Sequence, residues 1–274
     1  MNGTTKRSVG ALTVLLAVFG GVVLLGTGAT AAVAGAHQLD ARSGSLEADA
    51  EGVNSLDMDV SAADVRVEFR GSAADAELRI EQGSTSGWSL TRDGDELTVR
   101  GPRQAFELFR PDWVRGGWFD KDPRVTLVLP ESLEGLDADL TLNAGALAVD
   151  GAFDELGVRL NAGSLTVTGE TRTLTAQLNA GNARIDLDGV RSASYTVNAG
   201  KIESTLRSVP DAVDVRVAAG RLELLLPDAA YDLRREESAG TLRSSLREDS
   251  RSEHRIRASV TAGTVVLEPS GFGD

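Results

Sequence analysis

The chain has 274 residues, a formal net charge of -13, two histidines and no cysteine. The lack of cysteine excludes a disulfide framework, a thiolate nucleophile, and zinc or iron-sulfur sites built on cysteine. The two histidines, His37 and His254, are too far apart in the sequence to suggest a metal site or a Ser-His-Asp relay, and an acidic surface disfavours nucleic acids as partners because it repels phosphates.

A long uncharged segment follows Lys6 and Arg7. About 20 apolar residues in a helix span a bilayer of about 30 Å, so residues 9–36 predict one N-terminal transmembrane helix. Basic residues before such a helix remain in the cytoplasm. We therefore expect residues 1–8 to form a cytoplasmic tail and residues 40–274 to form the extracytoplasmic domain of a single-pass protein of the cell membrane. The alternative is a signal segment, cleaved at one of the A-x-A motifs near its end, and a secreted product.

Residues 84–124 are less regular than the rest. The letters WSLTRDGDELTVRG place Asp-Gly between two alternating runs, which is typical of a β-hairpin with a tight turn. The stretch after this hairpin contains five of the twelve aromatic residues of the chain, including Trp113 and Trp118. This aromatic insertion could recognise a sugar or a protein, which makes Trp113 and Trp118 candidate partner-binding residues. Alternatively, it caps the open end of a stack of repeats.

A repeat dominates the second half of the chain. The letters LNAG occur three times and VNAG once, and aligned glycines recur every 18 to 23 residues as far as Gly263. A weaker copy lies at residues 61–67, with Ala63 in place of the glycine. A fixed period of this length is typical of repeat architectures.

Apolar residues alternate along each repeat, as in a strand with one buried face. The apolar positions change at NAG from even numbers (Leu156, Val158 and Leu160) to odd numbers (Leu165 and Val167). A continuous strand cannot change its buried face in this way, so NAG is predicted to form a corner. Glycine accepts a positive φ, and asparagine tolerates it while bonding to nearby backbone. The predicted structural corner residues are Asn143, Gly145, Asn161, Gly163, Asn179, Gly181, Asn198 and Gly200.

The constant period favours one coil per repeat over an antiparallel meander. We predict an all-β fold, namely a single-stranded parallel β-solenoid with coils of about 18–20 residues, in which the rest of each coil serves as the crossover that parallel strands require. Stacking would place equivalent residues about 4.8 Å apart, so the corner asparagines would form a ladder of amide groups.

Catalytic and metal-binding patterns are weak. Aspartates near the corners do not form the glycine-rich calcium-binding nonapeptide of some solenoids, and no nucleotide loop or nucleophile elbow is present. No acid, base and positioning arginine can be selected as a set. We predict that the protein is not an enzyme and has no catalytic residue, cofactor or metal.

The chain resembles the bacterial β-strand-repeat family of unknown function labelled "putative adhesin". The resemblance lies in DVRVE from residue 64, DGDELTV from residue 93, VTLVLP from residue 125, and the NAG repeats. It implies a surface-exposed, membrane-anchored and non-catalytic domain. We therefore expect an adhesin-like or envelope-interaction module that binds an envelope protein or a polysaccharide and attaches to the membrane through its N-terminal helix. The alternatives are an accessory protein in envelope-stress signalling and a self-assembling structural solenoid.

Overall fold

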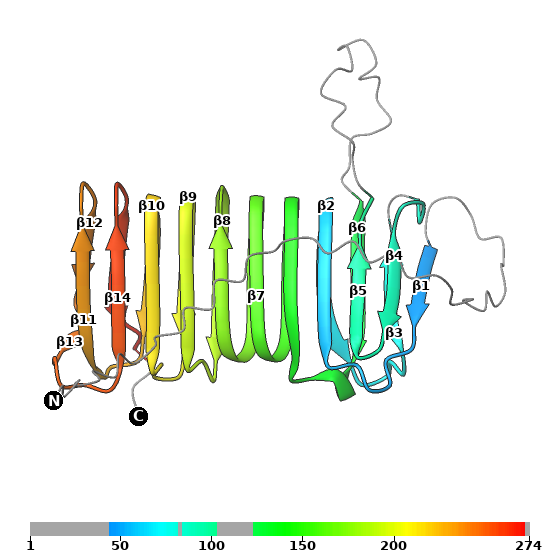
Figure 1. Cartoon of the computed structure of the whole chain (residues 1–274), viewed down its shortest axis with the longest axis horizontal. Coiled ribbons are helices and arrows are strands. Elements are labelled where there is room, and N and C mark those ends of the chain that lie inside the picture. Colours follow the sequence, from blue (N-terminus) through cyan, green and yellow to red (C-terminus); the bar gives the residue numbers. More distant parts are fainter. Residues whose placement is uncertain (1–43, 82–83, 103–122, 272–274) are drawn as a thin grey trace, which may run out of the picture. The chain divides into compact units, whose positions relative to one another are not determined.

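Alternating apolar and polar residues place most of the described chain in one β-sheet (Figure 1). This computed structural model describes residues 44–81, 84–102 and 123–271, and within them the only helical segment is the 3-10 turn η2 (Glu131–Leu133). The predicted all-β class is confirmed. The strands are β1 (Gly44–Ala48), β2 (Ser55–Arg70), β3 (Ala76–Ile80), β4 (Ser89–Asp93), β5 (Glu96–Arg100), β6 (Arg124–Pro130), β7 (Leu136–Leu178), β8 (Gly181–Asp188), β9 (Ser192–Leu206), β10 (Ala212–Leu226), β11 (Ala230–Glu237), β12 (Thr241–Ser244), β13 (Arg247–Glu248), β14 (Arg255–Val260) and β15 (Thr264–Pro269).

The sheet is mixed, so the prediction of a single-stranded parallel β-solenoid is wrong. β1 pairs antiparallel with β3, β3 pairs antiparallel with β6, and β4 pairs antiparallel with β5. The hairpin of β4 and β5 shows the physical reason, because its turn contains Gly94 at a φ of 65° and joins two adjacent strands. A connection this short reverses the chain and can only give an antiparallel pair.

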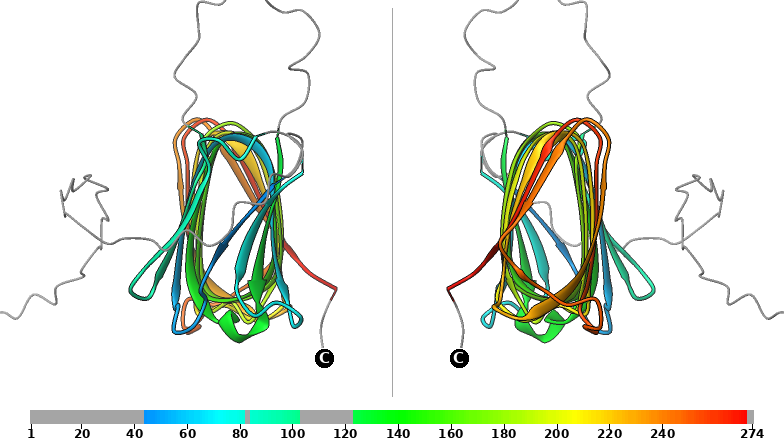
Figure 2. Two further views of the ribbon diagram at one scale, coloured as in Figure 1. Left: turned by 90° about the vertical axis from the view of Figure 1, so that its right-hand side faces the viewer. Right: turned by 90° about the vertical axis from the view of Figure 1, so that its left-hand side faces the viewer.

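The remaining strands pair in parallel, with a register that follows the sequence repeat. Gly163 lies opposite Gly181, and Gly200 lies opposite Gly220. β7 to β10 lie side by side in Figure 1, and the end views in Figure 2 show these strands behind one another. Equivalent residues of successive repeats therefore form rows that run across the strands.

The last repeats do not follow chain order. β14 and β15 pair with β10 on one side and with β11 and β12 on the other, so the last segment of the chain lies between two earlier ones. β11 places Arg235 and Glu237 opposite Ala258 and Val260, which are buried. Charged side chains at these core-facing positions are tolerated only in a terminal layer, where they reach solvent. The repeat that contains β11 and β12 therefore ends the sheet.

Apolar side chains from the two halves of each repeat form the core. Leu160 before the corner and Val167 after it are both fully buried. The core also contains one polar pair, in which the Tyr195 hydroxyl lies 2.8 Å from Ser204 Oγ. Burial raises the pKa of Tyr195, so its hydroxyl stays neutral and the hydrogen bond satisfies two buried polar groups.

Among the described residues, no helix is long and apolar enough to cross a membrane. This finding contradicts the predicted single-pass protein of the cell membrane. Residues 1–8 and 9–36, on which that prediction depended, lie outside the described residues.

Candidate functional site

The corners of successive repeats carry a row of asparagine side chains. Asn161 donates from Nδ2 to Oδ1 of Asn143 at 2.6 Å, Asn179 donates to Asn161, and Asn198 donates to Asn179 at 2.5 Å. At the end of the row, Asn143 Nδ2 lies 3.4 Å from Oδ1 of Asp59. These amide groups bond to one another, so a ligand at the corners would have to replace bonds that join the repeats.

The corner glycines allow the repeats to approach closely. Gly145, Gly163, Gly181 and Gly200 have φ angles of 116°, 124°, 118° and 119°. A Cβ atom on Gly163 would lie 1.9 Å from the carbonyl oxygen of Gly145, and a Cβ atom on Gly181 would lie 2.0 Å from that of Gly163. The structure therefore uses both the positive φ and the missing side chain of these glycines.

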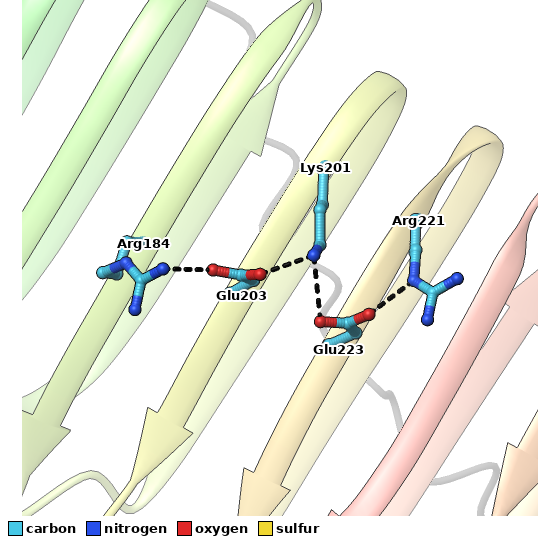
Figure 3. A network of polar contacts seen from close by, with 5 residues as sticks. All are labelled: Arg184, Lys201, Glu203, Arg221 and Glu223. Carbon is cyan, nitrogen blue, oxygen red and sulfur yellow. Dashed lines mark hydrogen bonds and ion pairs between the residues drawn. The ribbon is translucent and has the colours of Figure 1, made fainter.

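Five charged residues on β8, β9 and β10 form one network on the surface of the sheet (Figure 3). Arg184 Nη2 lies 2.7 Å from Oε2 of Glu203. Lys201 Nζ lies 2.5 Å from Oε1 of Glu203 and 3.1 Å from Oε2 of Glu223. Arg221 Nε lies 2.6 Å from Oε1 of Glu223. Each charge faces one of opposite sign, so this network links three repeats.

The contacts of Lys201 shift the pKa values within this network. Its hydrogen bonds lower the pKa of Glu203 and of Glu223, and Arg221 also lowers the pKa of Glu223. The two carboxylates in turn raise the pKa of Lys201. These shifts favour the charged forms of Lys201, Glu203 and Glu223 at neutral pH.

A shallow groove of about 510 Å³, which we call groove A, lies on the surface formed by strand segments that follow the corners. Its floor consists of small side chains of β7, and its walls are longer charged side chains of β2, β3 and β6. Arg66, for example, lies beside Ala148 in register, so a long side chain borders a short one. The groove is lined by Ala146, Ala148, Ser164 and Thr166 on the floor, and by Asp64, Arg66, Glu68, Arg70, Arg79, Glu81, Arg124 and Thr126 on the walls, with Val65 and Leu147 beneath them.

Most of the charges in groove A have partners. Arg79 Nη2 lies 2.6 Å from Oε2 of Glu77, and Arg70 Nη2 lies 2.5 Å from Oε1 of Glu68. The hydrogen bond from Arg79 lowers the pKa of Glu77. Arg66 is exposed and forms no ion pair or hydrogen bond with another described side chain. Groove A thus offers one guanidinium group whose donors are available to a ligand.

One described end of the aromatic insertion borders groove A. β5 ends at Arg100 and β6 begins at Arg124, and these two strands pair with β2 on the two sides of its corner. Arg124, the first residue of β6, also lines groove A. Trp113 and Trp118, the candidate partner-binding residues, lie outside the described residues.

A second groove of about 710 Å³, groove B, lies on the surface formed by strand segments that precede the corners. It contains four arginines from three neighbouring strands. Arg234 pairs with Asp232 at 3.1 Å, and Arg235 pairs with Glu248. The other two arginines, Arg216 and Arg257, have no ion pair with any residue that the structure describes. Groove B therefore has a surplus of positive charge on an acidic protein.

The acidic side chains near the corners are held by neighbours. Asp154 pairs with Arg172 at 2.5 Å, and the pKa of Asp186 is lowered by its hydrogen bonds with Arg207. Across residues 44–81, 84–102 and 123–271, no three potential ligand side chains lie close enough to hold a metal ion. The corner residues could be predicted from the sequence, but the arginines of groove A could not. Their only sequence signal is the contrast between charged residues in β2 and small residues in β7.

No protein-family model matches the chain, and no curated protein matches it. Similar solved structures include a "putative cell adhesion protein" from Clostridium sporogenes, with 11% identity and a TM-score of 0.36 over 84% of this chain and 99% of that one. They also include a "putative adhesin" from Bacteroides fragilis, with 10% identity and a TM-score of 0.38 over 84% of this chain and 98% of that one. These descriptions agree with the family resemblance seen in the sequence. Likeness at this level defines neither the fold nor the function of this chain.

Proposed function

We propose that the protein is a non-catalytic, adhesin-like binding module, and that groove A receives its partner. The partner is a protein or a polysaccharide of the cell envelope. The observation that carries this proposal is the combination of a small-residue floor with the exposed Arg66, which has no ion pair with a described residue. The low floor lets a segment of the partner lie close to the sheet, and the guanidinium group provides several donors in a fixed plane.

The polar lining of groove A indicates the chemistry of the partner. Hydroxyl groups of Ser164 and Thr166, carboxylates and arginines all line the groove, whereas large apolar side chains do not form its walls. Such a surface fits the hydroxyl groups of a glycan or a polar loop better than an apolar small molecule, whose sites are mostly apolar. Trp113 and Trp118, which lie outside the described residues, are aromatic residues of the kind that stacks on sugar rings, and they remain candidate partner-binding residues.

End-to-end self-assembly is the less favoured function. At one end of the sheet, β11 presents Arg235 and Glu237 where a further stacked repeat would require apolar residues. Charged side chains at such positions prevent edge-to-edge pairing.

The test is binding of the full-length protein to isolated cell-envelope fractions and to a panel of immobilised glycans. We expect Arg66→Ala and Ala148→Arg to reduce binding at least tenfold, the first by removing the donors and the second by filling the floor. Arg243→Ala is the matched control, because Arg243 is also exposed on a strand but lies outside groove A. Unchanged binding by both groove variants would refute the assignment of groove A.

A second pair of changes tests the insertion. If Trp113→Ala together with Trp118→Ala abolishes binding at an unchanged melting temperature, the insertion contacts the partner. If the melting temperature falls instead, the tryptophans act as a cap, as buried aromatic residues do when truncated.

A further inference from the structure

The surface that precedes the corners, here called the pre-corner face, separates its charges along the row of strands. The register aligns three outward-facing residues from each strand segment. In spatial order, the pre-corner face consists of Glu96, Thr98 and Arg100; Ser55, Asp57 and Asp59; Asp137, Asp139 and Thr141; Glu155, Gly157 and Arg159; Thr173, Thr175 and Gln177; Ser192, Ser194 and Thr196; Ala212, Asp214 and Arg216; Arg255, Arg257 and Ser259; and Asp232, Arg234 and Glu236. Beyond β5, the antiparallel strand β4 continues the row.

One end of the pre-corner face is acidic. Asp57 lies directly opposite Asp139 in register, and Asp137 lies beside them on β7. Arg100 neutralises Asp57 at 2.5 Å, but Asp139 forms no ion pair with any described residue. Burial and the charge of Asp57 raise the pKa of Asp139, the nearby charge of Arg159 opposes this shift, and the charge of Asp137 adds to it. The acidic end therefore contains like charges that repel each other and are only partly compensated within the chain.

The other end carries a concentration of arginines. Arg255 and Arg257 project from β14, and Arg257 lies opposite Arg234 of β11 in register. Both arginines of β14 are exposed, and neither forms an ion pair with a residue that the structure describes. The arginines are not alone at this end, because Arg257 also lies opposite Asp214 of β10 and Arg255 lies opposite Asp232 of β11. Arginines are therefore in excess here, but both signs of charge are present.

The middle of the pre-corner face has short, uncharged side chains. Thr173 and Thr175 on β7 lie opposite Ser192 and Ser194 on β9. These short hydroxyl side chains leave no charge and no bulky group between the acidic and the basic ends. A partner could therefore approach these central segments without meeting a long side chain.

A second copy of the chain has the complementary arrangement. In the spatial order given above, the segment with Asp137 and Asp139 lies two positions before the segment that begins at Thr173. The segment with Arg255 and Arg257 lies two positions after the segment that begins at Ser192. A two-fold axis parallel to the strands, passing between the Thr173 and Ser192 segments, exchanges these two positions. It thus brings each acidic pair of one copy opposite the basic pair of the other, as an isologous interface requires.

We propose that two copies of this chain associate through their pre-corner faces, with Asp137 and Asp139 of each copy facing Arg255 and Arg257 of the other. The eight strand segments that this axis overlays, from the Ser55 segment to the Asp232 segment, have a length of about 35 Å and a width of about 17 Å, so the interface covers about 1,200 Å² in total. That value is at the lower limit of specific protein interfaces and predicts a weak, salt-sensitive dimer. Along one rim the same axis places Arg159 opposite Arg216 and Asp59 opposite Glu236, and these two contacts between like charges also limit the affinity.

This inference does not depend on the proposed function, because groove A lies on the other face and remains open in the dimer. A dimer would present two copies of groove A, so a weak partner contact at each would be strengthened by bivalent binding.

The test is a charge exchange, followed by sedimentation equilibrium of the full chain in a nonionic detergent. One variant combines Asp137→Arg with Asp139→Arg, and the other combines Arg255→Asp with Arg257→Asp. Each variant alone should dimerise at least tenfold more weakly than the parent, because like charges then face each other. An equimolar mixture of the two should restore dimerisation, because in the mixed pair every reversed side chain faces its opposite charge.

The parent dimer should dissociate as the salt concentration rises from about 50 mM to about 500 mM. The control combines Asp150→Arg with Arg243→Asp outside the pre-corner face, and it should dimerise like the parent. A parent that remains monomeric at about 100 µM, or a mixture that does not restore association, would overturn the proposal. If a reversed variant loses its circular dichroism spectrum, the milder pairs Asp137→Asn with Asp139→Asn and Arg255→Gln with Arg257→Gln replace it. Each milder pair should weaken the dimer, and an unchanged dissociation constant in both would overturn the proposal equally.

Discussion

Replacing Gly181 by alanine adds one methyl group at a corner where the structure has no room for it. Gly181 has a φ of 118°, and its Cβ atom would lie 2.0 Å from the carbonyl oxygen of Gly163 and 2.9 Å from the nitrogen and the carbonyl carbon of that residue. All three neighbours are backbone atoms, so no side-chain rotation can relieve the overlap. The parallel pair of β7 and β8 would have to separate locally.

Two costs add at this position. Holding a residue other than glycine in a sparsely populated backbone region costs about 1 to 3 kcal/mol. Forcing an extra methyl group into packed surroundings costs a further 1 to 3 kcal/mol, roughly. We therefore expect Gly181→Ala to lower the free energy of unfolding by about 2 to 6 kcal/mol. For a chain of this size, that corresponds to a fall in melting temperature of about 4 to 24 °C.

The measurement is urea denaturation followed by circular dichroism, with the midpoint and the slope compared between variants. Gly189→Ala is the control, because Gly189 also has a positive φ, 70°, but its Cβ would meet only the carbonyl oxygen of Thr171 at 3.8 Å. This control should lose only about 1 kcal/mol, the cost of the left-handed conformation. Equal losses for the two variants would refute the argument that the adjacent repeat excludes a side chain.

Three further changes test the core, the ion-pair network and the terminal layer. Tyr195→Phe leaves the buried Ser204 hydroxyl without its partner and should cost about 1 to 2 kcal/mol in urea denaturation, whereas adding Ser204→Ala should recover part of that loss. Lys201→Gln should destabilise the protein at pH 7. Because the pKa values of its two glutamate partners are lowered, the stabilisation by these ion pairs is fully present above the usual glutamate pKa of about 4.3 and is lost as the pH falls through the lowered values. The melting temperatures of parent and variant should therefore converge in acid. The raised pKa of Lys201 means that this contribution is also lost when the pH rises through that value. Arg235→Leu with Glu237→Leu should promote concentration-dependent association in light scattering, because it removes the charges that protect the terminal layer; unchanged scattering would contradict that role.

Local chemistry in the sequence was sufficient to predict the strands and their buried faces. Apolar residues alternate on both sides of NAG, and the change of their numbering at Gly163 required a corner, because a strand cannot otherwise move its buried side chains to the other face. The asparagine and glycine positions of the corners could also be read from the sequence, since they depend on backbone conformation at single residues.

The neighbours of each strand were decided only by the tertiary structure. Repeats of similar sequence offer similar edges to one another, so the period does not say which repeat lies beside which. The prediction of a uniform parallel stack was therefore wrong for the hairpin of β4 and β5 and for the position of β14 between β10 and β11. Arg235 and Glu237 do indicate the terminal layer in the sequence. They occupy core-facing positions, and a repeat with charged residues at such positions cannot have a neighbouring repeat packed on both of its sides.

The grooves and the separation of charge likewise depend on register. Arg66 and Ala148 are far apart in the chain, and their side-by-side placement creates the wall and the floor of groove A. The spatial order of the strands between Asp139 and Arg257 determines that these two residues lie toward opposite ends of one face. The sequence thus determined which residues face solvent, because that depends on alternation within a strand. The structure decided which of those residues form a common surface, because that depends on pairing between strands that are distant in the chain.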